Sequence, residues 1–132
     1  MEVRGSMSQL ITLVRGLIND NSVEFQFSDS EIQSSLDLYR EYVVNESLKA
    51  YREPNGDQFK FQTFERYWDS DLTLSTPDGI TVVPATSDPI SGYYTFDESQ
   101  EAVYATGFHY DIYATASDLL LRWAGRIEQD VT

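Results

Sequence analysis

The chain has 132 residues, of which 41% are hydrophobic and 14% aromatic, and its net charge is −13. A chain of this length and composition can bury one core, so we expect a single domain over residues 1–132. The absence of cysteine excludes disulfides and thiolate chemistry. The negative charge argues against a surface that binds nucleic acid by neutralising phosphates.

The first predicted element is an amphipathic helix over about residues 8–19, with Ser8 as its expected N-cap. Its apolar residues recur at three- and four-residue steps, as one face of a helix requires. They are Leu10, Leu13, Val14, Leu17 and Ile18. The polar cluster at 19–22 is expected to end this helix, because its side chains can bond the local backbone.

A second helix is predicted over about residues 28–44. Ser28 is followed three residues later by Glu31, the spacing of a capping box. Phe27 before the cap and Ile32 within the first turn can form a hydrophobic staple. The expected inward stripe consists of Ile32, Leu36, Tyr39 and Val43.

The middle of the chain, about residues 58–96, is predicted to be a small antiparallel β region. Alternation over 58–64 indicates a strand, although aromatic residues this close together could also begin a loop. Residues 72–74 and 80–83 flank a turn that contains Pro77 and Gly79, which predicts a hairpin. A further strand is expected at 93–96. So small a sheet is expected to need a helix packed against it.

The longest regular pattern predicts a C-terminal helix over residues 106–129, about 36 Å long. Its apolar residues again recur at three- and four-residue steps, and Tyr113 and Leu120 widen the stripe. The stripe is formed by Phe108, Ile112, Ala116, Leu119, Trp123 and Ile127. The predicted fold is therefore α+β: a mainly helical subunit, with two N-terminal helices and a long C-terminal one, that carries a small antiparallel β insertion.

No pattern in the sequence indicates catalysis, so we expect no enzyme, no cofactor and no metal. The single histidine, His109, has no metal-ligand spacing around it and is expected to be partly buried at a helix end. Asp111 and Ser117 lie along the same predicted helix and cannot complete a triad with it. Carboxylate pairs are expected to be solvated: Asp69 with Asp71, Asp97 with Glu98, and Glu128 with Asp130.

No apolar run approaches the roughly 20 residues of a membrane span, and the N-terminus lacks the apolar stretch of a signal peptide. We therefore expect a protein of the cytoplasm with no membrane contact.

Several segments carry a distinctive set of residues. They read GYYTF at 92–96, VYATG at 103–107, YDIYA at 110–114, ASDLL at 116–120 and WA at 123–124. WDSD at 68–71, the apolar pattern over 10–20 and FSDSEI at 27–32 belong to the same set. Together they resemble the head-to-tail connector (adaptor) proteins of tailed bacteriophages, and the resemblance covers most of the chain.

This resemblance implies a structural virion protein located at the neck, present in the host cytoplasm during assembly. Such subunits form a homo-oligomeric ring, usually twelvefold, beneath the portal protein. The ring extends the DNA channel and offers a surface to stopper or tail-completion proteins. Double-stranded DNA passes through without specific binding, and an acidic channel wall would let it slide because like charges repel.

A side-by-side ring needs two different faces on each subunit. Tyr110, Tyr113 and Leu121 fall partly off the predicted inward stripe and are candidates for such a face, and Trp123 belongs either to the core or to the interface. A broad monomer core is the other interpretation of these tyrosines. Two other functions stay open: a different neck or tail-completion protein, and a non-viral acidic protein-interaction module.

Overall fold

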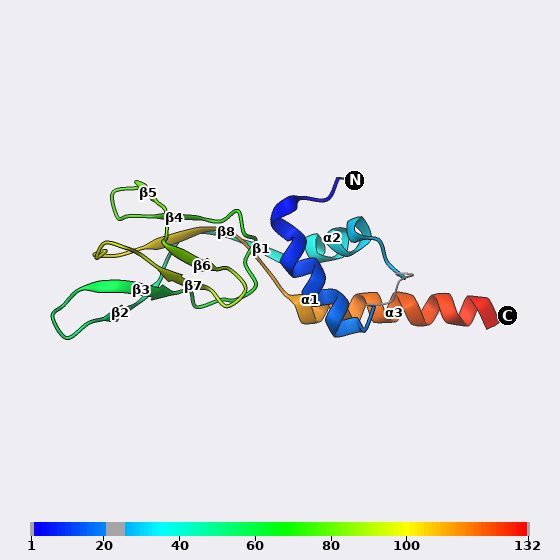
Figure 1. Ribbon diagram of the computed structural model, residues 1–132. Coiled ribbons are helices and arrows are strands. Elements are labelled where there is room, and N and C mark those ends of the chain that lie inside the picture. Colours follow the sequence, from blue (N-terminus) through cyan, green and yellow to red (C-terminus); the bar gives the residue numbers. More distant parts are fainter. Residues whose placement is uncertain (1, 21–25, 132) are drawn as a thin grey trace. The chain divides into compact units, whose positions relative to one another are not determined.

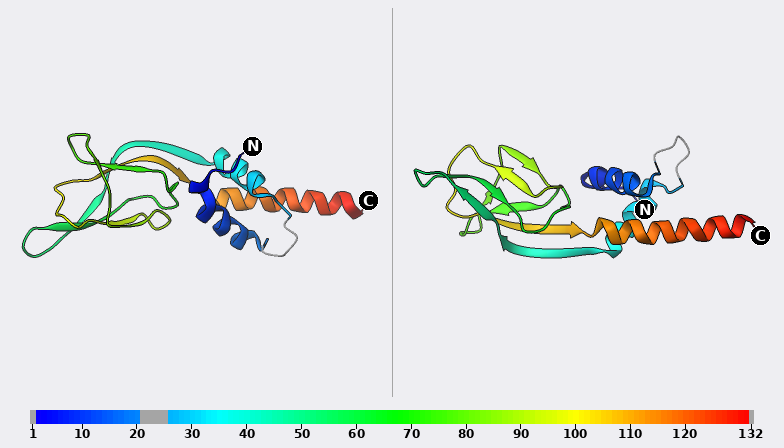
Figure 2. Two further views of the ribbon diagram at one scale, coloured as in Figure 1. Left: turned by 45° about the horizontal axis from the view of Figure 1, so that its top comes forward. Right: turned by 90° about the horizontal axis from the view of Figure 1, so that it is seen from below.

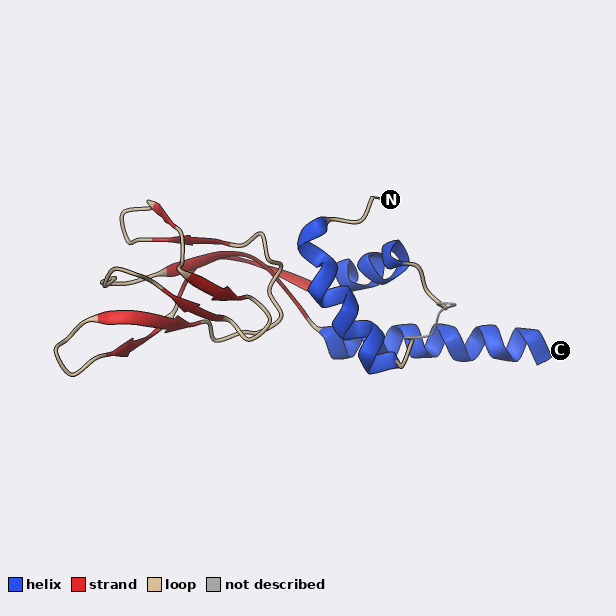
Figure 3. Ribbon diagram, viewed as in Figure 1, coloured by secondary structure: helices blue, strands red, loops and turns tan. Residues whose placement is uncertain are grey.

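The computed structural model describes residues 2–20 and 26–131, with side chains as far as residue 127. The described chain divides into two compact units. The helical unit comprises residues 1–40 and 110–132, and the β unit comprises residues 41–109. The colours of Figure 3 distinguish the helices of one unit from the strands of the other. Each unit is described separately below.

The predicted balance of helix and strand is wrong. Helix accounts for 33% of the chain and strand for 30%, and the strands form two four-stranded antiparallel sheets. The molecule is therefore not a mainly helical subunit with a small β insertion. The error has a local cause, because residues 40–44 and 106–110 were predicted to be helical from their apolar spacing, and both lie in strands.

The helical unit begins with a short 3-10 helix, Gly5–Met7, and continues into α1, Ser8–Ile18. The predicted first helix is thus confirmed, although Met7 is the N-cap and Ser8 is already helical. Leu10, Val14 and Ile18 are buried on one face. The helix ends where Asn19 adopts a left-handed conformation with φ 59°, a common helix C-terminus for this residue.

Helix α2, Asp29–Leu38, begins as predicted and ends six residues early. The capping box is confirmed: Ser28 Oγ accepts from the Glu31 amide at 3.1 Å, and Glu31 Oε1 accepts from the Ser28 amide at 3.0 Å. Beyond Leu38 the chain becomes strand β1, Arg40–Ser47. Its β-branched and aromatic run at 42–44 favours extended backbone, and pairing with a neighbouring strand outweighs the helical spacing.

Helix α3, Ile112–Val131, is the predicted C-terminal helix, but it begins six residues later than expected. Asp111 precedes it and caps it, because Asp111 Oδ1 accepts from the Ala114 amide at 2.9 Å. The preceding residues form strand β8, Tyr104–Tyr110, whose side chains alternate in burial. Phe108 is therefore not part of the helix stripe. Figures 1 and 2 show that α3 runs past the ends of α1 and α2 in every view.

The β unit contains two sheets, ordered β1-β8-β4-β5 and β2-β3-β7-β6 (Figure 1). The predicted strands at 58–64 and 93–96 are confirmed as β3 and β7. The predicted hairpin is confirmed as β4 and β5, and Gly79 in its turn has φ +81°. The remaining bounds are β2 Lys49–Arg52, β3 Gln58–Gln62, β4 Thr73–Ser75, β5 Thr81–Val82, β6 Thr86–Asp88 and β7 Tyr93–Thr95.

The two sheets share one hydrophobic core. Leu74 and Ala105 come from the first sheet, and Phe61 and Tyr94 come from the second. Trp68 completes this cluster at 1% exposure, with its indole N–H donating to Thr63 Oγ1 at 3.1 Å. The expectation that the strands need a helix packed against them is therefore wrong, because each sheet covers the apolar face of the other.

Candidate functional site

His109 and Asp111, which are close in sequence, each have structural neighbours of their own. His109 lies on β8 rather than at a helix end, with its side chain 13% exposed. Its ring centre is 5.1 Å from that of Trp68, and its Nε2 is 3.4 Å from Glu41 Oε2. Asp111 is occupied in capping α3. Among the described residues, no group of three or more His, Asp or Glu side chains could hold a metal ion.

The paired carboxylates differ in their surroundings. Asp97 and Glu98 are exposed, as predicted. Asp69 is only 2% exposed, so its predicted solvation is wrong, and its Oδ1 accepts from the Asp71 amide at 3.2 Å. This carboxylate therefore serves the local turn. The side chains of residues 128 and 130 lie outside the described part.

Trp123 packs into the helical unit and is half-buried. Its ring centre is 6.2 Å from that of Phe27, in an edge-to-face arrangement at 85°. Phe27 is fully buried and lies directly before α2. In this chain Trp123 therefore joins α3 to the start of α2, and only part of its surface faces outward.

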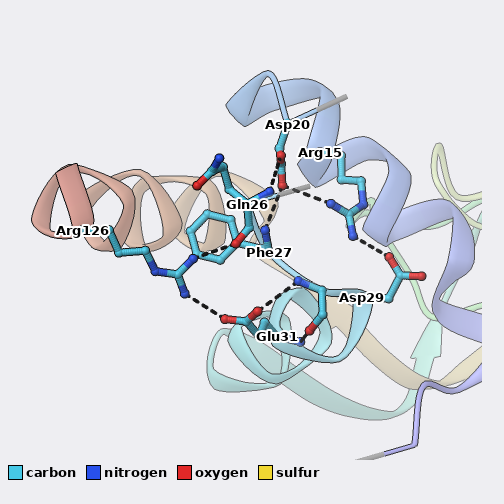
Figure 4. A network of polar contacts seen from close by, with 8 residues as sticks. Arg15, Asp20, Gln26, Phe27, Asp29, Glu31 and Arg126 are labelled. Carbon is cyan, nitrogen blue, oxygen red and sulfur yellow. Dashed lines mark hydrogen bonds and ion pairs between the residues drawn. The ribbon is translucent and has the colours of Figure 1, made fainter. Parts of the chain in front are cut away.

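A polar network surrounds Phe27 (Figure 4). Arg126 lies over the Phe27 ring at 4.5 Å, donates to Gln26 O at 2.6 Å and pairs with Glu31 Oε2 at 2.9 Å. The backbone hydrogen bond from Ser28, together with Arg126, lowers the pKa of Glu31. Because Arg126 reaches from α3 to both Gln26 and Glu31, it holds the N-terminal end of α2 against α3.

A second part of the network fixes the end of α1. Arg15 pairs with Asp20 at 3.0 Å and with Asp29 at 2.6 Å. Asp20 also accepts from the amides of Gln26 and Phe27, at 2.9 and 3.2 Å. Arg15 is thus a buried residue that connects α1 to the segment before α2 and to its first residue.

Tyr110, one of the predicted interface residues, is buried at 2% exposure. Arg4 donates to its hydroxyl at 3.4 Å and pairs with Asp37 at 2.7 Å. The hydrogen bond and charge of Asp37 raise the pKa of Arg4. Tyr110 therefore lies inside the helical unit of the isolated chain.

The other two predicted residues are on the surface of α3. Tyr113 is 60% exposed and Leu121 is 74% exposed. Two residues that sequence spacing assigned to the inward stripe, Leu120 and Ile127, are also exposed, at 46% and 54%. We call these four residues the exposed α3 row.

Three residues of the exposed α3 row lie on one side of the helix. Tyr113, Leu120 and Ile127 are seven residues apart, so they recur every two turns on one side of α3. The buried residues Ile112 and Leu119 occupy a different side. Sequence periodicity alone did not separate these two faces, because a broad apolar stripe is equally compatible with a broad core. Only the packing of α1 and α2 distinguishes them.

Comparisons of the chain with family models, with curated proteins and with solved structures find no match. Within residues 2–20 and 26–131, no helix is long and apolar enough to cross a membrane.

Proposed function

We propose that this chain is a structural protein of a tailed-phage virion, a head-to-tail connector whose copies join side by side in a ring beneath the portal. The observation that carries the proposal is the exposed α3 row. Large apolar side chains gathered on one helix face are typical of surfaces that another protein covers. Their regular spacing suits packing against a helix.

Two further features support this function. The residues that resemble connector proteins fall in both units, from the start of α1 to Trp123 of α3, so the resemblance does not depend on one short motif. The net charge of −13 suits a channel wall that repels DNA phosphates and does not retain the genome. In this proposal the portal protein and the stopper or tail-completion proteins are the partners, and the usual ring is twelvefold.

The test is the particle mass of the full chain, measured by sedimentation velocity, alone and with purified portal protein. The wild-type chain is expected to form a closed oligomer or to join the portal. The double variant Leu120→Glu/Ile127→Glu should remain a monomer, because it places two charges in the apolar interface.

The matched control is Ile80→Glu/Val83→Glu, which changes two apolar residues of the β unit that are 62% and 85% exposed. It should assemble as the wild type does. A wild-type chain that stays monomeric at high concentration and ignores the portal would favour a non-viral interaction module. Binding to another neck protein instead would favour a different position in the neck.

A further inference from the structure

The β unit contains a cavity of about 230 Å³ whose walls come from both sheets. Strands β5 and β6 contribute to it, and each is the last strand in the order of its sheet, with no described strand paired to its outer edge. The apolar part of the wall consists mainly of Leu72, Leu74, Val82, Pro84, Pro89 and Tyr94. We call this space the edge cavity.

The edge cavity exists because its two edge strands are short and carry small side chains. Strand β5 consists only of Thr81 and Val82, so it covers little of the strand beside it. In the second sheet, Ser87 of β6 lies directly opposite Tyr94 of β7, so the two side chains share the inner face. A serine at this inner position is too small to fill the space beside the Tyr94 ring.

Tyr94 gives the edge cavity a hydrogen-bonding group. The residue is 1% exposed, and its hydroxyl is buried with no hydrogen-bond partner among the described residues. Burial, with Asp88 nearby, raises the pKa of Tyr94, so the hydroxyl keeps its proton and can donate. Buried hydroxyls in folded proteins nearly always have a partner, and a group that enters the cavity can supply one.

The volume of the edge cavity limits what can enter it. A cavity of about 150 Å³ holds a benzene ring, whereas pockets for drug-sized molecules begin at about 300 Å³. The 230 Å³ found here therefore suits one aromatic side chain. A hydroxyl on that ring would pair with Tyr94, and tyrosine is the side chain that has both parts.

A second hollow next to the edge cavity is acidic. The two are neighbours because Val82 and Val83 line both. Asp97 and Glu98 line the second hollow, are exposed and form no salt bridge to a described residue. Val83 itself is 85% exposed. An extended segment paired with the outer edge of β5 would cover Val83, whereas a small free amine would leave it in water.

We propose that the edge cavity binds a tyrosine side chain from a basic segment of another protein. The hydroxyl of that tyrosine pairs with Tyr94, and a lysine or arginine beside it pairs with Asp97 and Glu98. Charge favours such a partner, because none of the residues that line the two hollows is Lys, Arg or His. The net charge of −13 disfavours a second copy of this chain. The site shares no residue with the exposed α3 row, so the inference does not depend on the connector proposal.

The experiment measures the binding of two capped peptides, acetyl-GYKRG-amide and acetyl-GFKRG-amide, to the full chain. The NMR signals of the peptide report the dissociation constant whether the chain is monomeric or assembled. The tyrosine peptide is expected to bind with a dissociation constant of about 1 mM, and the phenylalanine peptide about fivefold more weakly. Tyr94→Phe should abolish the difference between the peptides without lowering the urea midpoint, because it removes only the unpaired hydroxyl.

A pair of double variants tests the acidic hollow. Asp97→Asn/Glu98→Gln is expected to weaken binding of the tyrosine peptide about fivefold. The matched control is Glu53→Gln/Glu65→Gln, which removes two exposed carboxylates elsewhere in the β unit and should bind as the wild type does. Circular dichroism and thermal melting check that every variant is folded.

Several outcomes would overturn the inference. They are no binding of the tyrosine peptide at about 10 mM, equal binding of the two peptides to the wild type, and equal losses in the two double variants. Tyramine carries a phenol and an amine without a peptide chain, so tyramine that binds as tightly as the tyrosine peptide would indicate a small-molecule site instead. None of these results bears on the connector proposal, which the particle mass tests separately.

Discussion

The rings of Trp123 and Phe27 pack edge to face, with an angle of 85° between their planes and 6.2 Å between their centres. This pair joins residues nearly one hundred positions apart, and it links the last helix of the chain to the start of α2. Trp123 was predicted to lie either in the core or at an interface. It is half-buried, so part of its side chain packs against Phe27 and part faces outward.

The first prediction concerns Trp123→Ala. A fully buried tryptophan costs about 3–5 kcal/mol when truncated, and the partial exposure here reduces the expected loss to about 1–3 kcal/mol. Urea unfolding followed by circular dichroism at 222 nm measures it. Val83→Ala, at a residue that is 85% exposed and lies outside the exposed α3 row, is the control and should change stability by less than about 0.5 kcal/mol. Equal losses in the two variants would show that the Phe27 contact contributes little.

The second prediction concerns the buried ion pair of Arg15 with Asp20. Their side chains are 8% and 1% exposed, and Asp20→Ala removes one of the two carboxylates that pair with Arg15 together with the acceptor of two backbone amides. We expect a loss of about 2–4 kcal/mol. Thermal melting of Arg122→Ala provides the comparison, because that residue pairs with Asp118 on an exposed helix face and should cost about 0.5 kcal/mol or less.

The third prediction concerns Gly92, which has φ +75°. A Cβ at this position would lie 1.8 Å from Thr63 Oγ1 and 2.9 Å from Glu65 O, so alanine cannot fit without moving the backbone. Gly92→Ala should destabilise the β unit by more than about 3 kcal/mol. Gly79 has a similar φ of +81° but open space around it, and Gly79→Ala should cost about 1 kcal/mol. Fluorescence of the buried Trp68 reports on this unit.

The fourth prediction concerns pH. Burial raises the pKa of Glu46 above its ordinary value of 4.5, and one of its carboxylate oxygens is buried with no hydrogen-bond partner among the described residues. The folded state then binds more protons than the unfolded state above pH 4.5, so this residue makes stability fall as pH rises through the folded pKa. Glu46→Gln should remove that fall and be at least as stable as the wild type at pH 7.

Urea midpoints at pH 4.5, 5.5, 6.5 and 7.5 would measure this effect. Glu98→Gln, at an exposed carboxylate, is the control for the loss of one negative charge. A Glu46→Gln variant that follows the wild-type curve would show that the carboxyl group is solvated.

Local patterns determined several elements without help from the rest of the chain. The capping box of Ser28 with Glu31 set the start of α2, and Pro77 with Gly79 set the turn of the β4–β5 hairpin. These features depend on neighbouring residues alone, since a cap or a turn forms through bonds within a few positions. Sequence also indicated that Tyr110, Tyr113 and Leu121 fall partly off the inward stripe. Tyr113 and Leu121 are exposed, whereas Tyr110 is buried.

Only the tertiary structure decided where the helices end and the sheets begin. Residues 40–44 and 106–110 fit a helical period, and they belong to strands because extended partners are available to them. In the same way, Leu120 and Ile127 matched the core stripe of α3 but lie outside it, because α1 and α2 cover a different side. Spacing along the chain identifies apolar residues, whereas the partner that buries each of them is set by contacts between residues far apart in sequence.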